Sequence, residues 1–339
     1  MLTDELIKKG KFWTDAWSLV DGCSPVSEGC DNCWMAKSAH MRQSNPNPKI
    51  AAANAGLTTD GVFNGTVRFR EDKLNIPCRA RKSRVYAIWS DLYHPSVKDS
   101  EIKSALQTMY NPLIPYQGSP HTFLIVTKRP ERAAEFFATY KLAEGALDAM
   151  NHIWHIVTCE NQARADERIP HLLNIPGKRG IIIEPMLGAV DFSTAYPDDY
   201  FYCCGCGWHG VDDGYENMEC IKCEGKEYDD DGCCKNCGGS MEHICPKCGG
   251  NEYNDQFSYG EIYTFKPEFA KMPGIHQVIL GGENGRGKRP MHPDWARSVR
   301  DQCEAAGVPF FMKSMGSAWK GEVPEDLNIK QLAWAMKEG

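Results

Sequence analysis

Three cysteines lie within a stretch of eleven residues near the start of the chain, and they could hold a metal cofactor. They are Cys23, Cys30 and Cys33, in the sequence GCSPVSEGCDNCW (residues 22–34). A structural zinc site needs four ligands in a closed tetrahedron. A 4Fe-4S cluster held by only three thiolates leaves one iron without a protein ligand, and that iron is free to bind a cofactor or substrate. The spacing therefore predicts an open iron–sulfur cluster.

S-adenosylmethionine (SAM) suits such an open iron, because its amino and carboxylate groups can chelate the metal. One electron from the reduced cluster then cleaves the C5′–S bond of SAM and releases a 5′-deoxyadenosyl radical. The protein must hold cofactor, cluster and target hydrogen in line and exclude water. From spacing alone, the alternative is a zinc knuckle completed by His40, Cys78 or His94.

The elements that must position this loop are continuously apolar runs, each followed by polar residues and then a helical stretch. Such runs are typical of strands buried on both faces of a parallel sheet. They begin near residues 84, 121, 152, 180 and 276, with WSLVDG (17–22) as the first strand and VPFFMKS (308–314) as a possible last one. Helices are predicted over Asp99–Tyr110, Pro130–Thr139, 161–173 and 292–306. This order indicates an α/β fold, either a (β/α) barrel or a doubly wound sheet.

Polar residues follow the strands, at the point where each strand ends. Because the carboxyl ends of parallel strands meet at one edge, these residues should ring a single mouth together with the cysteine loop. The predicted ring comprises Ser90, Asp91, His94, Thr127, Lys128, Arg129, Glu160, Asn161, Glu184 and Glu283. A cluster loop that opens on this mouth is what radical chemistry inside a barrel requires.

A cysteine-rich segment over residues 191–274 interrupts this pattern, so we predict a barrel over 1–190 and 275–339 with an inserted domain between. CxxC pairs predict two zinc ribbons. The ligand sets are Cys203, Cys206, Cys220 and Cys223 for the first, and Cys234, Cys237, Cys245 and Cys248 for the second. Cys204 and Cys233 are left over, and His209 or His243 could replace one thiolate. Auxiliary iron–sulfur clusters are the alternative to zinc.

The composition and charge of the chain limit its cellular location and its binding partners. The chain has 339 residues and sixteen cysteines, its N-terminal stretch is charged, and no long apolar run occurs, which predicts a cytosolic protein without a membrane span. Residues 191–260 hold 15 acidic and 4 basic residues, whereas the remainder holds 30 and 34. The insert should repel nucleic-acid phosphates. Candidate backbone contacts are the basic run at residues 78–84 and Arg286, Lys288 and Arg289.

Five stretches resemble the uncharacterised radical-SAM-like protein family of phages and prophages, and they cover nearly all of the chain outside the insert. They are WSLVDGCSPVSEGCDNCW, WSDLYH, TKRPER, the segment from ENQARADERIP to AVDF, and the segment from GGENGRGKRP to MKSMG. Six residues separate the first two cysteines, where radical SAM enzymes usually have three. The resemblance implies a partial (β/α)6-type barrel, SAM cleavage, a reductase or flavodoxin-type electron donor, and a location in the cytoplasm of the host cell.

The resemblance also implies roles in binding SAM. Ser90 and Asp91 would receive its amino group, Lys128 or Arg129 would pair with its carboxylate, and Glu160 would accept its ribose hydroxyls. Further cofactor-binding candidates are Thr127, Glu184 and Glu283. The leading hypothesis is a radical SAM enzyme that modifies or rearranges a nucleotide or hypermodified base in phage DNA. The alternatives are a DNA-repair lyase, a peptide-modifying enzyme, and a non-catalytic zinc or iron–sulfur module that binds DNA or protein.

Overall fold

The structure is a computed structural model of the chain. It describes residues 2–110, 121–140, 151–195, 272 and 274–335, and the backbone of 200–203, 209–211, 218–220, 241–243 and 262–264. The chain divides into two compact units, Met1–Ala195 with Ile275–Gly339, and Tyr196–Gly274. Phe192 is buried and its backbone N–H donates to Oε1 of Gln302 at 2.7 Å. Residues 191–195 therefore belong with the first unit, although the sequence places the boundary before them.

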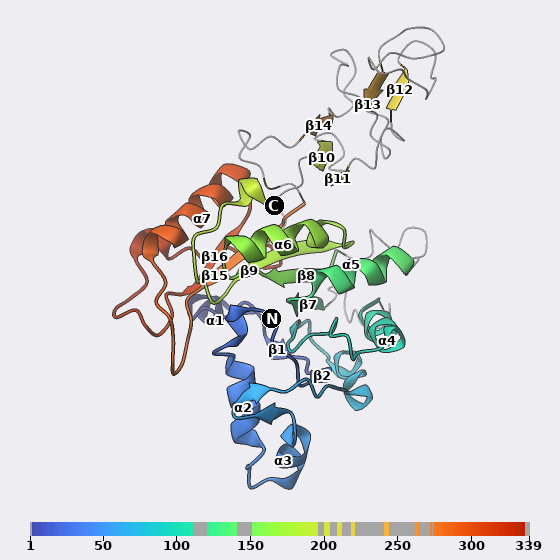
Figure 1. The fold of residues 1–339 in the computed structure, drawn as a ribbon, viewed down its shortest axis with the longest axis vertical. Coiled ribbons are helices and arrows are strands. Elements are labelled where there is room, and N and C mark those ends of the chain that lie inside the picture. Colours follow the sequence, from blue (N-terminus) through green and yellow to red (C-terminus); the bar gives the residue numbers. More distant parts are fainter. Residues whose placement is uncertain are drawn as a thin grey trace. The chain divides into compact units, whose positions relative to one another are not determined.

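A seven-stranded sheet forms the centre of the first unit (Figure 1). Its order is β1-β6-β7-β8-β9-β15-β16, and every neighbouring pair is parallel. The strands are β1 Asp15–Ala16, β6 Val85–Ile88, β7 Thr122–Thr127, β8 Ile153–Thr158, β9 Lys178–Ile183, β15 Gln277–Gly281 and β16 Phe310–Ser314. The sheet curls into half a barrel, which confirms the predicted α/β partial barrel, with seven strands rather than six.

Four helices connect the parallel strands, as crossovers in such a sheet require. They are α4 Asp99–Tyr110, α5 Pro130–Thr139, α6 Gln162–Leu173 and α7 Pro293–Ala306. All four predicted helices are confirmed. The last two begin one residue later than predicted, because Asn161 and His292 are N-caps whose side chains accept from the first turn.

The first strand differs from the prediction. WSLVDG was expected in the sheet, but β1 lies earlier, and β2 Val20–Asp21 pairs with β5 Arg68–Phe69 outside it. The chain turns where the N–H of Leu19 donates to the carbonyl of Trp17 at 2.9 Å. This turn takes the chain out of the sheet and toward the cysteine loop.

A small lobe follows that loop. It contains α2 Trp34–Arg42, α3 Pro48–Asn54 and the hairpin of β3 Thr58–Thr59 and β4 Val62–Phe63. Its buried cluster is Ala36, Ala39, Leu57 and Phe63, and Cys23, Cys33 and Met35 pack against it. The lobe therefore fixes one side of the loop through apolar contacts.

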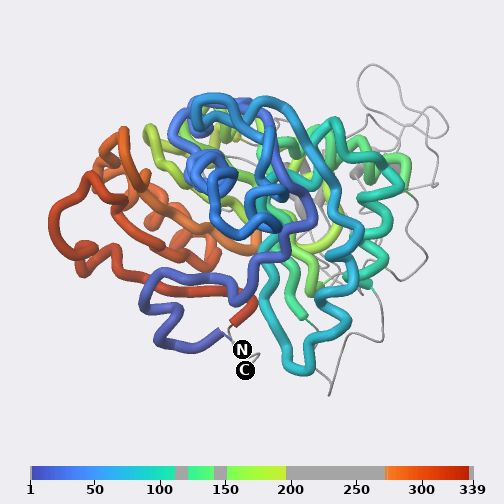
Figure 2. Tube along the Cα trace, turned by 90° about the horizontal axis from the view of Figure 1, so that it is seen from below, coloured from blue at the N-terminus to red at the C-terminus, as the bar shows by residue number. Residues whose placement is uncertain are grey.

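The inner face of the sheet is covered by the two ends of the chain. Phe12, which follows α1 Asp4–Lys8, and Leu332 belong to one buried cluster with side chains of β6 to β16. Nε1 of Trp334 donates to the carbonyl of Phe12 at 3.1 Å, and Figure 2 shows the two end segments side by side. These contacts close the inside of the half-barrel below its carboxyl edge.

In the second unit only strand backbones are described. β10 Tyr200–Cys203 pairs with β11 His209–Val211 and β14 Ile262–Thr264, and β12 Met218–Cys220 pairs with β13 Met241–His243, all antiparallel. Of the predicted zinc ligands, Cys203 and Cys220 end strands, and the other six lie outside the described residues. Among the described residues, none of the helices combines the length and apolar character that a membrane crossing requires.

Candidate cluster site at the carboxyl edge of the sheet

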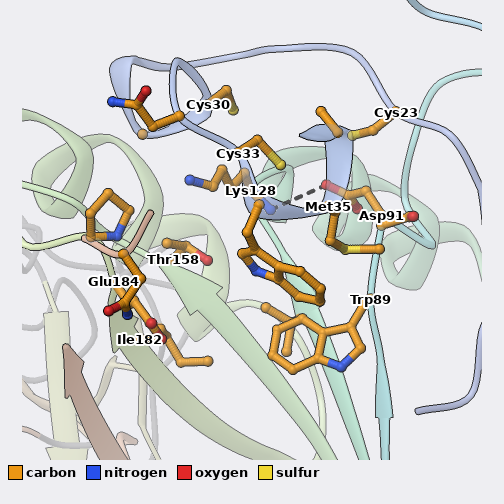
Figure 3. A pocket seen from close by; sticks show the side chains of 18 of the residues that line it. Cys23, Cys30, Cys33, Met35, Trp89, Asp91, Lys128, Thr158, Ile182 and Glu184 are labelled. Carbon is orange, nitrogen blue, oxygen red and sulfur yellow. Dashed lines mark hydrogen bonds between the residues drawn. The ribbon is translucent and has the colours of Figure 1, made fainter. Parts of the chain in front are cut away.

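The three cysteines lie on the loop between β2 and α2 and line one cavity at the carboxyl edge of the sheet (Figure 3). The cavity has a volume of about 550 Å³. The predicted ring contributes Ser90, Asp91, Thr127, Lys128, Arg129, Glu184 and Glu283 to its lining. The other three predicted residues, His94, Glu160 and Asn161, do not line it. The sequence therefore predicted most of the polar residues that meet here, because parallel strands end at a common edge.

Two glycines let the cysteine loop approach its neighbours closely. Gly22 has φ +87°, and a Cβ there would lie 2.0 Å from the carbonyl oxygen of Thr66. A Cβ on Gly29 would lie 2.2 Å from Oε1 of Glu160. A side chain at Gly22 would push the loop away from the backbone at Thr66, and one at Gly29 would push it away from Glu160, so both positions need glycine.

Asp91 and Arg129 tie the start of the loop to strands β6 and β7. Asp91 is 2% exposed, and Oδ2 accepts from Nη1 of Arg129 at 2.8 Å. Nη2 of Arg129 donates to the carbonyl and hydroxyl oxygens of Ser24, both at 2.9 Å, and Nη1 reaches Sγ of Cys23 at 3.7 Å. Asp91 also accepts from the hydroxyl of Thr127 at 2.7 Å and from two backbone N–H groups. Its oxygens are therefore already used by protein donors.

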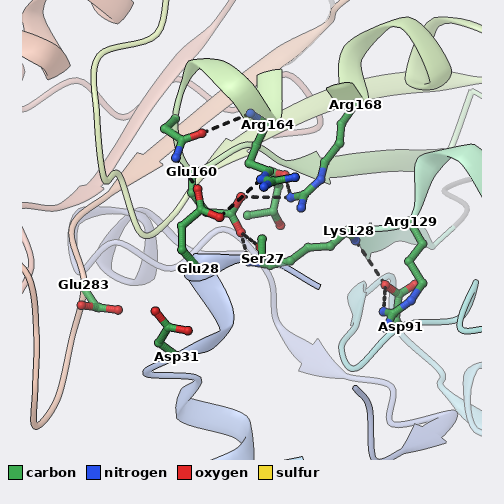
Figure 4. A network of polar contacts seen from close by, with 12 residues as sticks. Ser27, Glu28, Asp31, Asp91, Lys128, Arg129, Glu160, Arg164, Arg168 and Glu283 are labelled. Carbon is green, nitrogen blue, oxygen red and sulfur yellow. Dashed lines mark hydrogen bonds and ion pairs between the residues drawn. The ribbon is translucent and has the colours of Figure 1, made fainter. Parts of the chain in front are cut away.

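Glu160 ties down the middle of the loop (Figure 4). Its side chain is fully buried and accepts from the hydroxyl of Ser27 at 2.7 Å, from Lys128, and from Arg168 at 3.0 Å. Burial raises the pKa of Glu160, but Lys128 and Arg168 outweigh it and hold the pKa below its usual value. Glu160 is not among the residues that line the cavity. This geometry does not support the predicted contact with ribose and gives Glu160 a structural role instead.

Glu283 and Arg289 hold the end of the loop from the β15 side. Arg289 donates to both oxygens of Glu283, at 2.6 and 3.0 Å, and to the carbonyl of Glu28 at 3.0 Å. Its Nη1 also pairs with Asp31 at 3.2 Å, and Nδ2 of Asn32 reaches Glu283 at 3.3 Å. Arg289, a candidate phosphate contact from the sequence, is therefore engaged within the protein.

The backbone is strained where the β6 strand meets the cavity. Ser90 has φ +65°, a left-handed conformation that non-glycine residues rarely adopt. It stands between Trp89 and Asp91, and all three line the cavity. Strain of this kind persists only where the surroundings enforce it, and it concentrates at functional sites.

The candidates for completing a zinc knuckle have other hydrogen-bond partners or lie outside the cavity. Nδ1 of His94 accepts from the N–H of Ser96 at 3.1 Å, and Nε2 is hydrogen-bonded to the hydroxyl of Ser24 at 2.9 Å. Both ring nitrogens are thus occupied. Neither His40 nor Cys78 lines the cavity. Within the described residues, no three His, Cys, Asp or Glu side chains converge to hold a single metal ion.

The residues present fit an iron–sulfur cluster by their chemistry. In a cluster each thiolate binds its own iron, so the sulfurs stand further apart than around one ion. The three thiols share one cavity, and a guanidinium donor reaches Cys23, as donors to cluster sulfurs do. Burial, with help from Asp91, raises the pKa of Cys23 to about 11, and burial also raises the pKa of Cys33. These thiols would need to lose their protons on binding metal.

Several residues that line this cavity were not predicted from the sequence. Trp13, Trp34 and Trp89 line the cavity, as do Lys313 and Ser314. Nζ of Lys313 donates to both oxygens of Glu184, at 2.6 and 2.7 Å. Two features of the sequence could have identified two of them: Trp34 directly follows Cys33, and Lys313 lies at the end of the predicted strand VPFFMKS.

Together these features define an α/β protein with a curled parallel sheet whose carboxyl edge holds a clamped three-cysteine loop over a cavity. The chain belongs to the family described as "Protein of unknown function (DUF5131)", whose model matches residues 9–333. Searches of curated proteins and of solved structures each gave no match.

Proposed function

We propose that this protein is a radical SAM enzyme of the phage and prophage type, with a 4Fe-4S cluster held by Cys23, Cys30 and Cys33. The observation that carries the proposal is one loop whose three thiols line the same cavity while strand ends clamp it on both sides. When bound, cluster and SAM would supply a 5′-deoxyadenosyl radical. Such chemistry needs rigid positioning and exclusion of water, which a clamped loop over a partly apolar cavity supports.

The chain's own polar groups divide into those that hold the loop and those that face the cavity. Asp91, Glu160 and Glu283 hold the loop. For the SAM carboxylate, Lys128 is better placed than Arg129. The Lys128 ammonium donates to Glu160 but has three donors, and its side chain is 20% exposed. The Arg129 side chain is 10% exposed, and both of its terminal nitrogens already bind Asp91 or Ser24. For the SAM amino group, Ser90 is the candidate that keeps free capacity in this geometry.

For the substrate we propose a nucleotide or a base in DNA, which the enzyme would modify or rearrange. Support comes from the charge of the first unit, since basic residues outnumber acidic ones outside the acidic insert. An electron donor of the reductase or flavodoxin type would complete the system.

For the insert we propose two structural zinc ribbons, on the spacing of its CxxC pairs. Metal analysis of anaerobically purified protein should then give about two zinc ions per chain besides cluster iron, from four ligands per site. Iron in place of zinc at these thiols would make them auxiliary clusters instead.

The test of the enzyme proposal is SAM cleavage. Anaerobically reconstituted protein with SAM and dithionite should form 5′-deoxyadenosine and methionine, and adding digested phage DNA should give a nucleoside of changed mass. Colourless protein that contains zinc only and leaves SAM intact would favour the non-catalytic binding module.

A further inference from the structure

The mouth of the cavity carries an exposed apolar rim. Trp34 is 58% exposed, Val62 is 43% exposed and Val26 is 39% exposed, and all three line the cavity. They come from separate segments, namely α2, β4 and the cysteine loop. Large apolar side chains gathered at a cavity mouth are typical of a binding surface, whereas scattered ones need no explanation. The rim therefore indicates a ligand that brings an apolar or aromatic face.

Tryptophans continue from this rim into the cavity. The rings of Trp34 and Trp89 meet edge to face with centroids 6.0 Å apart, and Trp89 meets Trp13 in the same way at 6.0 Å. Trp89 thus packs against the Trp34 ring on the cavity side, while more than half of the Trp34 surface remains exposed to solvent. Because Trp34 follows Cys33 directly, a ring stacked on it would lie beside the proposed cluster.

Basic residues stand next to this tryptophan. Lys37, one turn after Trp34 on α2, donates from Nζ to the carbonyl of Arg286 at 2.9 Å, which holds the loop at 284–288 against the helix. Arg286 and Lys288 are exposed, and within the described residues neither has a salt bridge. By contrast, Arg289 on the same loop is bound to Glu283 and Asp31.

We propose that this rim is a nucleotide platform that takes an unpaired base of single-stranded DNA, with the base stacked on Trp34 and the neighbouring phosphates against Arg286 and Lys288. The proposal rests on the function given above and specifies its substrate as unpaired. In a duplex the faces of each base are covered by its neighbours, whereas an unpaired base offers a face to an aromatic side chain. Stacking of this kind tolerates any base. The platform would therefore select single-stranded over double-stranded DNA without selecting a base sequence.

The test is fluorescence anisotropy of full-length protein with a labelled single-stranded DNA oligonucleotide and with its duplex, in the absence of SAM. The single strand should bind more tightly than the duplex. Trp34→Ala should weaken single-strand binding about tenfold or more, since a stacked base contributes on that order, and Trp34→Phe should retain most of it. The matched control is Trp319→Ala, because Trp319 is 37% exposed but does not line the cavity.

Charge reversal tests the phosphate contacts. Arg286→Glu with Lys288→Glu should weaken binding and reduce the salt slope by about 1.4, from two lost contacts to a single strand. The matched control reverses Arg81 and Lys82, the basic pair in the run at residues 78–84 that the sequence also suggested as phosphate contacts. Both are exposed, but they precede β6 and therefore lie at the edge of the sheet opposite the cavity, where the platform cannot use them. This control should leave binding unchanged, and a thermal melt of each variant checks folding.

Three results would each overturn the platform. They are equal binding by wild type and Trp34→Ala, equal affinity for duplex and single strand, and a loss of binding in the Arg81 and Lys82 control as large as that in the Arg286 and Lys288 variant. SAM cleavage without any oligonucleotide is measured in parallel. Cleavage without single-strand binding would refute the platform alone. Binding that follows the predicted pattern without cleavage would refute the radical SAM proposal and leave the platform standing.

Discussion

Arg129 joins Asp91, at the end of one strand, to the first residues of the cysteine loop: Nη1 lies 2.8 Å from Oδ2 of Asp91, and Nη2 lies 2.9 Å from both oxygens of Ser24. Both side chains of this ion pair are nearly buried, at 10% and 3% exposure. Removing one partner of a buried pair leaves an uncompensated charge, which costs far more than the pair itself contributes. The pair should therefore control how firmly the loop is held.

Asp91→Ala should lower the free energy of unfolding by about 3 to 5 kcal/mol and reduce cluster iron retained on gel filtration. Arg129→Lys keeps the charge but loses the fork that reaches Ser24, so an intermediate loss is expected. Urea unfolding and iron analysis give both quantities. Full stability and full iron, with weakened SAM binding, would instead make Asp91 a direct contact to SAM.

Gly29→Ala should push the loop away from the sheet, because its Cβ would lie 2.2 Å from a carboxylate oxygen of Glu160. Glu160 is held by Arg168, Lys128 and Ser27 and has little room to move. We expect a loss of about 1 to 3 kcal/mol in the free energy of unfolding, as for overpacking, and a lower iron content.

Gly61→Ala is the matched control for this variant. Unlike Gly29, Gly61 has a positive φ of +82°, which strains an alanine backbone, but a Cβ there meets nothing within 4 Å. It should lose some stability and keep its iron. Equal iron loss in both variants would show that stability alone governs the iron content.

Glu160 and Arg168 should be strongly coupled, since both are almost fully buried. Glu160→Ala should cost about 3 to 5 kcal/mol in unfolding free energy, because the guanidinium is left buried without its carboxylate. The same change should cost much less in an Arg168→Met background. A double-mutant cycle measures this coupling, and strictly additive effects would show that the pair contributes nothing specific.

His155 should make the protein less stable at mildly acidic pH. Burial, with Arg179 nearby, lowers its pKa to about 3, and its Nε2 is hydrogen-bonded to the hydroxyl of Tyr93 at 2.8 Å. Between about pH 6.5 and 3 the unfolded chain binds this proton while the folded protein does not, so the free energy of unfolding falls as pH falls, by up to about 1.4 kcal/mol per pH unit.

His155→Gln should remove this part of the slope between about pH 6.5 and 5.5, the range just below the ordinary histidine pKa. His292→Asn provides the comparison, since its side chain is 60% exposed and asparagine can still cap α7. Denaturant melts across this range measure the slopes. An unchanged slope in His155→Gln would show that other groups cause the acid sensitivity.

The fold was largely predictable, because apolar runs and capping residues act locally. The helices Asp99–Tyr110 and Pro130–Thr139 agree in both bounds with their predictions, and the polar ends of the strands meet where parallel topology requires. The first strand was misplaced because a turn between Trp17 and Leu19, not apolar character, decides where the chain leaves the sheet.

Which polar side chains face the cavity and which ones hold the cysteine loop could not be predicted from the sequence. Polar type at a strand end does not reveal whether a side chain faces a ligand or a neighbouring loop. Glu160 is bound by Ser27, far away in sequence, and Arg289 is bound by Asp31 across an even longer separation. The exposure of Trp34 also depends on tertiary structure, although its position after Cys33 was visible.

The measurement that tests the central claim most directly is the iron and sulfide content of anaerobically reconstituted protein, with the variant Cys23→Ala, Cys30→Ala, Cys33→Ala beside wild type. Wild type should carry one 4Fe-4S cluster more than the variant and form 5′-deoxyadenosine from SAM, which the variant should not do. Cys78→Ala, which removes an exposed cysteine outside the cavity, should behave as wild type. Equal iron and sulfide in the wild type and the triple variant would contradict the assignment of the cluster to this loop.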